Sequence, residues 1–203
     1  MTQIALPLAR GDLGQAQRII VGAANAHVVE ALAHPASWPF GTAILSGPPR
    51  GGKSLLARWF AQTGSGQAID DANTLDETEL FHRWNRAQAE QVPLLLVCAA
   101  ATWNARLPDL ASRLAAALAL AIAAPDDAML TELIEAHAHT RGLTLSADAL
   151  SYLAARCERS YHGAEALVAA IDRLSLERKS PPAMPILRAA LDEVIGPDEP
   201  RLF

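Results

Sequence analysis

The sequence predicts an α/β protein in which a parallel sheet of four strands, of the phosphate-loop type, is followed by an all-helical C-terminal lid. Two observations lead to this fold class. Over the first 124 residues, short apolar runs alternate with helix-length segments, as in parallel sheets that are buried on both faces. A glycine-rich loop joins the first of these runs to a helix. We therefore expect an N-terminal segment at residues 1–10, a core at residues 11–124 and a lid at residues 125–203.

Composition narrows the class of protein further. The 203 residues allow one domain of ordinary size, or a core with a small lid, and 51% hydrophobic residues suffice for a sizeable core. No apolar run reaches the length of about 18 residues that a membrane span needs, and no secretion signal opens the chain, so we expect a cytoplasmic protein. The net charge of −5 argues against tight independent binding to duplex DNA, which normally requires a basic face.

The glycine-rich loop lies directly after the first apolar run. Residues 47–54 read GPPRGGKS and match the phosphate-loop pattern GxxxxGK[ST] at every fixed position. Glycines let consecutive N–H groups point at phosphate oxygens, and the next helix aims its positive end at the same place. In this pattern Lys53 reaches the β- and γ-phosphates and the Ser54 hydroxyl ligates Mg²⁺. The candidate nucleotide ligands in the loop are Pro48, Pro49, Arg50, Gly51, Gly52, Lys53 and Ser54.

The segments around the loop favour this interpretation over a chance match. Residues 42–45 form a short apolar run that predicts a buried strand, and residues 53–61 predict the helix that leaves the loop. Upstream, residues 19–25 are small and apolar. Val21 and Gly22 in that segment are equally compatible with a wall against a purine base, where close approach is needed, and with plain core packing.

Two carboxylates follow the next predicted strand. Asp70 and Asp71 come after Ile69, and an apolar strand ending in acidic residues is typical of the magnesium-organising position in such nucleotide sites. We expect Asp70 to hold Mg²⁺, directly or through water, and Asp71 to polarise a water; the pattern also fits a strand that merely ends at a turn. Only fifteen residues separate Ser54 from Asp70, so we expect a sheet that lacks one strand and helix at this point.

The next helix and strand are predicted from residues 74–91 and 93–98. The helix begins with Thr74 as N-cap and Glu77 three residues later, which is the spacing of a capping box. The strand is continuously apolar, as in a buried parallel sheet. A polar residue at the end of such a strand often contacts the γ-phosphate, but this chain has alanine at residues 99–101, with Thr102 the nearest hydroxyl. We therefore expect slow hydrolysis.

The rest of the chain is predicted to complete the sheet and build the lid. Residues 107–114 predict a short helix that carries Arg113, and residues 118–122 predict the last strand. From the sequence alone, a single arginine such as Arg113 is expected to be a solvated surface residue. Cys98 and Cys157 show no metal spacing and are expected to be reduced and buried. The lid helices are expected at residues 128–140, 146–158, 163–177 and 185–195.

The first ten residues, MTQIALPLAR, are too short for a domain and unusually apolar for a free tail. Gln3, Ile4, Leu6 and Leu8 alternate with other residues, and Pro7 favours an extended path. From the residues alone, an edge strand packed on its own domain is favoured over a linear motif that docks in the groove of a partner.

The order of these features resembles an AAA+ ATPase of the DnaA-related family. Residues 20–25 (IVGAAN) resemble the nucleotide-wall segment of that family, and residues 110–114, followed by Leu118, resemble its arginine-finger helix. Residues 3–8 are similar to the sliding-clamp-binding motif of the regulatory adaptors in the family. With the family in view, clamp docking becomes the favoured interpretation of the N-terminal segment.

The resemblance implies a function and a set of partners. ADP, or ATP, with Mg²⁺ would bind to the loop, with Val21 and Gly22 beside the base. Arg113 would act in trans as an arginine finger at the ATP of the replication initiator DnaA, promote hydrolysis there, and so repress replication initiation. A homodimer is compatible with the sequence; tight DNA binding and membrane association are not expected. The sliding clamp would be bound by Gln3, Ile4, Leu6, Pro7 and Leu8.

Departures from the family pattern bear on the bound nucleotide. Glu165 stands where the family carries a lid arginine that contacts phosphate, and Arg159 and Arg173 are the candidates to replace it. Because a carboxylate repels a triphosphate more than a diphosphate, we expect bound ADP and feeble intrinsic hydrolysis. The alternative function is an autonomous AAA+ ATPase of helicase-loader type, and a lesser one is a small phosphotransferase.

Overall fold

The computed structural model describes residues 19–99 and 103–196. The clamp-binding expectation for residues 1–10, and the hydroxyl of Thr102, fall outside these ranges. The chain forms two compact units, one extending to Ala123 and the other beginning at Ala124. No helix within the described ranges is long and apolar enough to cross a membrane.

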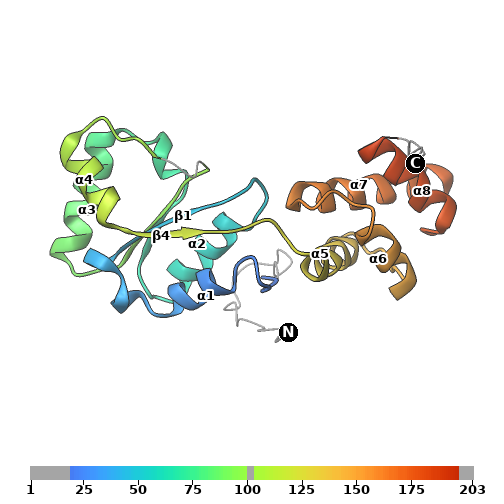
Figure 1. The fold of residues 1–203 in the computed structure, drawn as a ribbon, viewed down its shortest axis with the longest axis horizontal. Coiled ribbons are helices and arrows are strands. Elements are labelled where there is room, and N and C mark those ends of the chain that lie inside the picture. The colour runs from blue at the N-terminus through green and yellow to red at the C-terminus, as the bar shows by residue number, and fades with distance from the viewer. Residues whose placement is uncertain (1–18, 100–102, 197–203) are drawn as a thin grey trace, which may run out of the picture. The chain divides into compact units, whose positions relative to one another are not determined.

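The first unit is built on a four-stranded parallel sheet with the strand order β2-β3-β1-β4 (Figure 1). This confirms the predicted fold class. No further strand lies between Lys53 and Asp70 in the described chain, as the short spacing predicts. In the register, Ile44 lies between Leu96 of β3 and Ala119 of β4. The strands are β1 (Thr42–Ser46), β2 (Gln67–Ile69), β3 (Leu94–Val97) and β4 (Leu118–Ala121).

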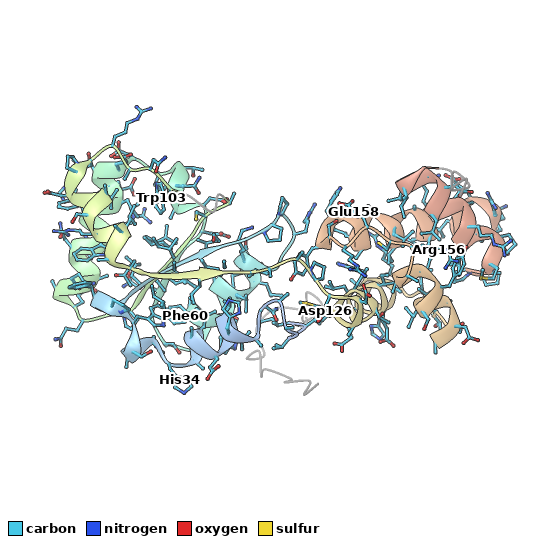
Figure 2. The ribbon with its side chains drawn as sticks, in the orientation of Figure 1. His34, Phe60, Trp103, Asp126, Arg156 and Glu158 are labelled. Carbon is cyan, nitrogen blue, oxygen red and sulfur yellow. The ribbon has the colours of Figure 1, made fainter. Side chains whose placement is uncertain are left out.

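Side-chain alternation along these strands supplies two apolar faces for helices to cover. Leu94 and Leu96 of β3 belong to a cluster with helices α3 and α4, whereas the side chain of Leu95 between them points to the opposite face. Phe60 of α2, labelled in Figure 2, is fully buried. Its ring stacks on that of Trp38, with 5.2 Å between the ring centres. The helices of this unit are α1 (Ala26–Ala33), α2 (Lys53–Gln62), α3 (Glu77–Ala89) and α4 (Pro108–Ala116).

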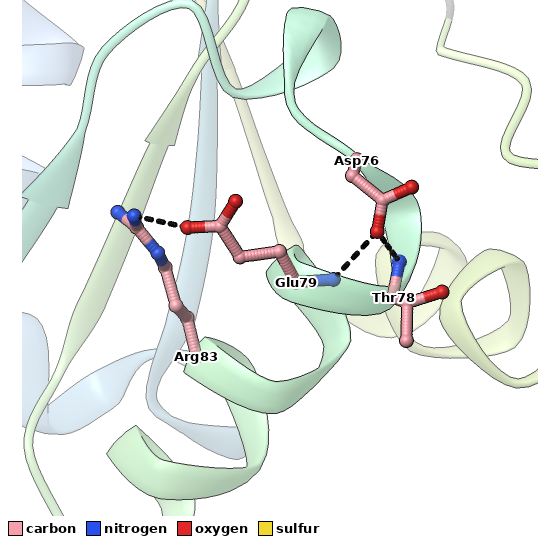
Figure 3. Close-up of polar contacts among 4 residues, drawn as sticks. All are labelled: Asp76, Thr78, Glu79 and Arg83. Carbon is pink, nitrogen blue, oxygen red and sulfur yellow. Dashed lines mark hydrogen bonds and ion pairs between the residues drawn. The ribbon is translucent and has the colours of Figure 1, made fainter.

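Helix α3 begins later than the sequence predicts, and Thr74 is not its cap. Asp76 is the N-cap, and its Oδ1 accepts hydrogen bonds of 3.0 Å from the N–H groups of both Thr78 and Glu79 (Figure 3). Thr74 instead ends a short 3₁₀ helix, Ala72–Thr74, and donates its hydroxyl to the carbonyl of Asp71. Both residue types cap helices, so only the path of the chain decides between them.

Within the described residues, the second unit contains four helices and its own apolar core, as predicted. The N-caps of the first three are polar, since Asp126, Ser146 and Ser160 each accept a hydrogen bond from the first turn of the helix that follows, whereas the fourth begins after Ala183 without a side-chain cap. The core includes Leu130, Ile134, Leu153, Leu167 and Ile171, all fully buried. The helices are α5 (Asp127–Thr140), α6 (Ala147–Ala154), α7 (Tyr161–Arg178) and α8 (Met184–Ile195).

Candidate nucleotide-binding site

The phosphate loop connects β1 to α2 and has a backbone suited to an anion. Arg50 and Gly52 have positive φ angles of 62° and 82°, while Gly51 between them does not. Backbone that alternates in this way turns successive N–H groups toward one concave face, which is a common way to hold a phosphate. Gly52 is also the residue from which α2 starts, in the left-handed region where a side chain is strained.

The ammonium group of Lys53 lies over its own loop. Its Nζ donates 2.9 Å hydrogen bonds to the carbonyl oxygens of Gly47 and Pro48. An ammonium group has three N–H donors, so one donor remains available for a phosphate oxygen without breaking either bond. The lysine therefore both braces the loop and carries the positive charge that the phosphate-loop pattern requires.

Cys98, directly after β3, lies close enough to feel this charge. Burial raises the pKa of the Cys98 thiol, and the positive charge of Lys53 opposes the increase. The thiol is therefore a neutral, buried neighbour of the loop. Cys98 and Cys157 are both buried and neither is in a disulfide bond, as predicted. At the position where a polar residue is common in such sheets, the described chain offers Cys98 and Ala99.

The predicted metal ligands lie at the carboxyl edge of the sheet. Ser54 is exposed in the first turn of α2, and Asp70 and Asp71 are exposed directly after β2. Since β3 separates β2 from β1, the acidic pair and the loop are two strands apart on one edge. No group of three or more His, Cys, Asp and Glu side chains in the described ranges could hold a metal. A magnesium site here would depend on phosphate oxygens, as is usual for Mg²⁺ beside a nucleotide.

The predicted base wall is anchored beside the loop. The N–H of Ala123 donates to the carbonyl of Ala24 at 3.0 Å, and the N–H of Ile122 donates to that of Ser46, the residue before the loop, at 2.9 Å. Val21 is half-buried and Gly22 is buried. The structure therefore brings the wall segment and the phosphate loop to the same end of β1 and β4.

Arg113 differs from the sequence expectation of a freely solvated arginine. It is half-buried on α4 and its guanidinium carbon lies 4.4 Å from the ring centre of Phe81 and 4.1 Å from that of Trp84. Its Nη1 also donates to the side-chain oxygen of Asn85. The guanidinium is held by α3 because two aromatic faces and an amide stand one helical turn apart on that helix.

Glu77 is a second residue whose position the sequence did not reveal. Both carboxylate oxygens accept hydrogen bonds from the backbone: 2.9 and 3.0 Å from the N–H of Arg106, and 2.7 Å from that of Leu107. These bonds hold the pKa of the Glu77 carboxyl below its usual value. The residue ties the start of α3 to the chain that enters α4, and so fixes the base of the helix that carries Arg113.

A polar cleft lies along this connection. Its volume is about 550 Å³, and its wall includes Arg106 and Trp103. Trp103 is labelled in Figure 2. Glu77 contributes to the same wall, but its carboxylate is already occupied by backbone donors. The cleft is therefore a feature of the α3–α4 connection and is separate from the phosphate loop.

In the lid, both arginines proposed as replacements are held by carboxylates. Arg159 pairs with Asp127 at 2.8 Å, and Arg173 pairs with Glu177 at 2.7 Å and also with Glu193. Glu165 is half-buried on α7. Each candidate arginine would have to exchange an existing partner in order to contact a phosphate.

Comparison with solved structures shows which fold the chain has. Domain III of the Thermotoga maritima replication initiation protein DnaA matches with a TM-score of 0.70 and 15% identity, over 88% of this chain and 95% of that one. A Thermotoga maritima RuvB Holliday junction branch migration motor matches with a TM-score of 0.61 and 17% identity, over 88% and 73%. A replication initiator DnaA bound to AMPPCP and single-stranded DNA matches with a TM-score of 0.58 and 19% identity, over 79% and 66%. The chain has the AAA+ fold.

The C-terminal unit also matches a model of a protein family. Residues 126–191 match the family described as Hda, lid domain. No curated protein sequence matches the chain. The chain therefore combines an AAA+ fold similar to that of DnaA domain III with a C-terminal segment that matches the Hda lid family.

Proposed function

We propose that the protein is a regulatory adaptor that binds the sliding clamp and promotes ATP hydrolysis by the replication initiator DnaA. The observation that carries the proposal is the match of residues 126–191 to the Hda lid, in a chain whose other unit has a phosphate loop. In this proposal the protein is cytoplasmic, acts on the initiator as a negative regulator, and does not bind duplex DNA tightly on its own.

The adaptor's own nucleotide is ADP, or ATP that it turns over slowly, together with Mg²⁺. Lys53 retains a donor for phosphate, and the loop backbone around Gly52 offers an anion site. In this proposal Asp70 would hold Mg²⁺, directly or through water, and Asp71 would polarise a water. Weak hydrolysis is supported by Glu165 at the lid position and by the ion pairs that occupy the lid arginines.

Arg113 is the group that the adaptor supplies in trans. An arginine finger neutralises charge on the phosphoryl group being transferred, and it is worth about 10³ to 10⁵ in rate. Release of Arg113 from the rings of Phe81 and Trp84 costs about 0.5 to 2 kcal/mol for a partly exposed cation–π contact. The gain therefore exceeds the cost of release, and α3 can hold the guanidinium in one orientation without preventing its use.

The N-terminal segment supplies the tether. An extended peptide can place Leu6 and Leu8 in an apolar groove of the clamp while Gln3 bonds at the rim, with Ile4 and Pro7 completing the motif. Binding to a clamp that is loaded on DNA concentrates the adaptor where the initiator is to be inactivated. A homodimer of the adaptor is compatible with this arrangement.

The test is single-turnover ATP hydrolysis by the initiator, with clamp loaded on DNA and adaptor added. The wild-type adaptor is expected to accelerate hydrolysis, and Arg113→Ala is expected to lose this effect while it keeps its fold and its clamp binding. Leu6→Ala with Leu8→Ala is expected to lose clamp binding and to leave thermal stability unchanged. Arg86→Ala, at an exposed arginine of α3, is the matched control.

Each of these measurements has an outcome that contradicts the proposal. Undiminished acceleration by Arg113→Ala removes the finger from the mechanism and leaves only a tether. A joint loss of clamp binding and thermal stability in the leucine variant means that residues 1–10 are an edge strand of their own domain. Brisk ATP turnover by the protein without partners favours the autonomous ATPase instead.

A further inference from the structure

Arg50 occupies a position in the phosphate loop whose backbone favours glycine. The N–H of Gly51 donates a 3.2 Å hydrogen bond to the carbonyl of Pro48, which closes a tight turn with Pro49 and Arg50 as its central residues. A proline followed by a residue of positive φ is the pattern of a type II turn, in which glycine or asparagine ordinarily fills the second central place. In this chain Arg50 fills it, with a φ of 62°.

This residue choice lowers the stability of the loop, because the side chain of an L-residue at positive φ crowds the backbone. Burial does not offset the cost, since Arg50 is exposed. Glycine is present one residue later, at Gly51, where φ is not positive. A long charged side chain held at an unfavourable backbone position directs attention to what that side chain binds.

The phosphate loop has few other sources of positive charge. Lys53 donates two of its three N–H groups to the carbonyls of Gly47 and Pro48, so one donor remains for a phosphate oxygen. The two lid arginines considered as phosphate ligands, Arg159 and Arg173, are paired with carboxylates of the lid itself. A diphosphate carries more negative charge than a single ammonium group neutralises, so the site calls for a further cation.

Arg50 is placed to be that cation. It belongs to the loop, so its reach does not depend on any residue of the lid. Its side chain begins beside Gly51 and Gly52, where the backbone turns successive N–H groups toward one concave face. A guanidinium group has a planar fork of N–H donors that can bond two oxygens of a phosphate at once.

We propose that the Arg50 side chain is a phosphate-binding cation, which lets the loop retain a nucleoside diphosphate without an arginine from the lid. The phosphate-loop pattern fixes residues 47, 52, 53 and 54 and leaves the side chain at residue 50 open, so this role goes beyond the pattern. The proposal rests on the nucleotide binding proposed above. It gives Arg50 two opposite effects, because the residue strains the free loop and stabilises the bound one.

An arginine that the turn merely tolerates leads to a different expectation. Its replacement by glycine would relieve the strain and leave the affinity for ADP unchanged. General damage to the loop would lower the affinity and the stability of the free protein together. A loss of affinity without a loss of stability therefore separates a contact with the ligand from both of these alternatives.

The experiment combines calorimetric titration of the full chain with ADP and Mg²⁺ and thermal unfolding of the nucleotide-free protein. Arg50→Gly is expected to bind ADP at least about tenfold more weakly than wild type, since a hydrogen bond between charged groups is worth such a factor or more. Its unfolding midpoint without nucleotide should be no lower than that of wild type. Arg50→Asn, which is neutral and tolerates positive φ, should show a similar loss of affinity.

Two further variants separate charge from backbone conformation. Arg50→Lys keeps the positive charge without the planar fork, so its affinity for ADP should lie between those of wild type and Arg50→Asn. The matched control is Lys179→Gly, which replaces another cation at positive φ, 49°, at the C-terminal end of α7. It relieves the same kind of strain in the lid and should keep the wild-type affinity.

The possible outcomes are distinguishable. Wild-type affinity in Arg50→Gly and Arg50→Asn overturns the role of Arg50 and leaves the nucleotide site standing. Equal weakening of the lysine and asparagine variants means that charge at residue 50 plays no part, and overturns the proposal as well. A loss of ADP binding in Arg159→Ala or Arg173→Ala, with Arg50→Gly unaffected, assigns the role to the lid. Failure of ADP to bind the folded wild type overturns the proposed nucleotide binding and this inference with it.

Discussion

The guanidinium carbon of Arg113 on α4 lies 4.1 Å from the centre of the Trp84 ring on α3. The indole N–H of Trp84 is buried and has no hydrogen-bond partner among the described residues. An aliphatic replacement of Trp84 therefore removes the ring face without leaving a new polar group unpaired, which makes the pair suited to a double-mutant cycle.

We expect Arg113→Ala and Trp84→Leu to be coupled by about 0.5 to 1 kcal/mol in the free energy of unfolding. The reason is that either change alone abolishes the same cation–π contact. Urea unfolding followed by circular dichroism measures the four members of the cycle. Arg86→Ala with Trp84→Leu is the control cycle and should be additive. Additivity in the Arg113 cycle would mean that the contact contributes nothing to stability.

Glu77 leads to a prediction about acid stability. Backbone donors lower the pKa of this carboxyl in the folded state, so the unfolded state binds more protons as the pH falls. The stabilisation is therefore fully present above the unfolded pKa, near 4.5, and is lost as the pH falls through the lower, folded value. We expect wild type to exceed Glu77→Gln in stability at neutral pH, and the difference to shrink below about pH 4.5.

Tryptophan fluorescence can follow this difference, because all four tryptophans of the chain, at positions 38, 59, 84 and 103, precede residue 124. Urea unfolding at several pH values between 3 and 7 gives the required series. Glu90→Gln, at the exposed end of the same helix, is the matched control. A difference between wild type and Glu77→Gln that does not vary with pH would indicate that the carboxylate charge plays no part.

The nucleotide site gives a third prediction. Lys53→Ala removes the ammonium that braces the carbonyls of Gly47 and Pro48 and that faces the phosphates, so we expect ADP binding to fall below detection. In the wild type, saturating ADP with Mg²⁺ should raise the midpoint of thermal unfolding, since the ligand binds only the folded state. Gln62→Ala, at the exposed end of α2, should keep the full increase. An equal increase in Lys53→Ala would place the nucleotide elsewhere.

The strands and the phosphate loop could be predicted because each is encoded locally. A continuous apolar run such as residues 94–97 has few alternatives to a buried strand, and GxxxxGK[ST] is a complete pattern within eight residues. The spacing from Ser54 to Asp70 likewise correctly predicted that no strand other than β2 lies between them in the described chain. These features required no knowledge of distant contacts.

The contacts that shape the site could not be predicted, because they join residues far apart in the chain or choose between equivalent partners. Arg113 meets Asn85 across 28 positions, and Glu77 meets Leu107 across 30. The side chain of Asn25, the N-cap residue of α1, could equally have capped that helix, which is the commoner use of the residue type, but it bonds to the backbone of Gly22 and Ile20 instead. In each case the residue type indicates what it can bond, whereas the fold decides what it does bond.

The lid gives the last prediction, which concerns alkaline pH. Burial, helped by the negative charge of Glu158, raises the pKa of the Cys157 thiol from 9.0 to about 11. The unfolded thiol therefore ionises first, and the stabilisation from the neutral buried thiol is complete below about pH 9 and lost as the pH rises through 11. Each pKa unit corresponds to about 1.4 kcal/mol, so the loss is on the order of 2 to 3 kcal/mol over this interval.

We expect Cys157→Ala to lose less stability than wild type between pH 8 and 11 in urea unfolding followed by circular dichroism. The Cys98→Ala variant, altered in the other unit, controls for general alkaline effects on the lid. Parallel pH profiles for wild type and Cys157→Ala would show that the thiol does not resist ionisation, and that residue 157 affects the lid only through packing.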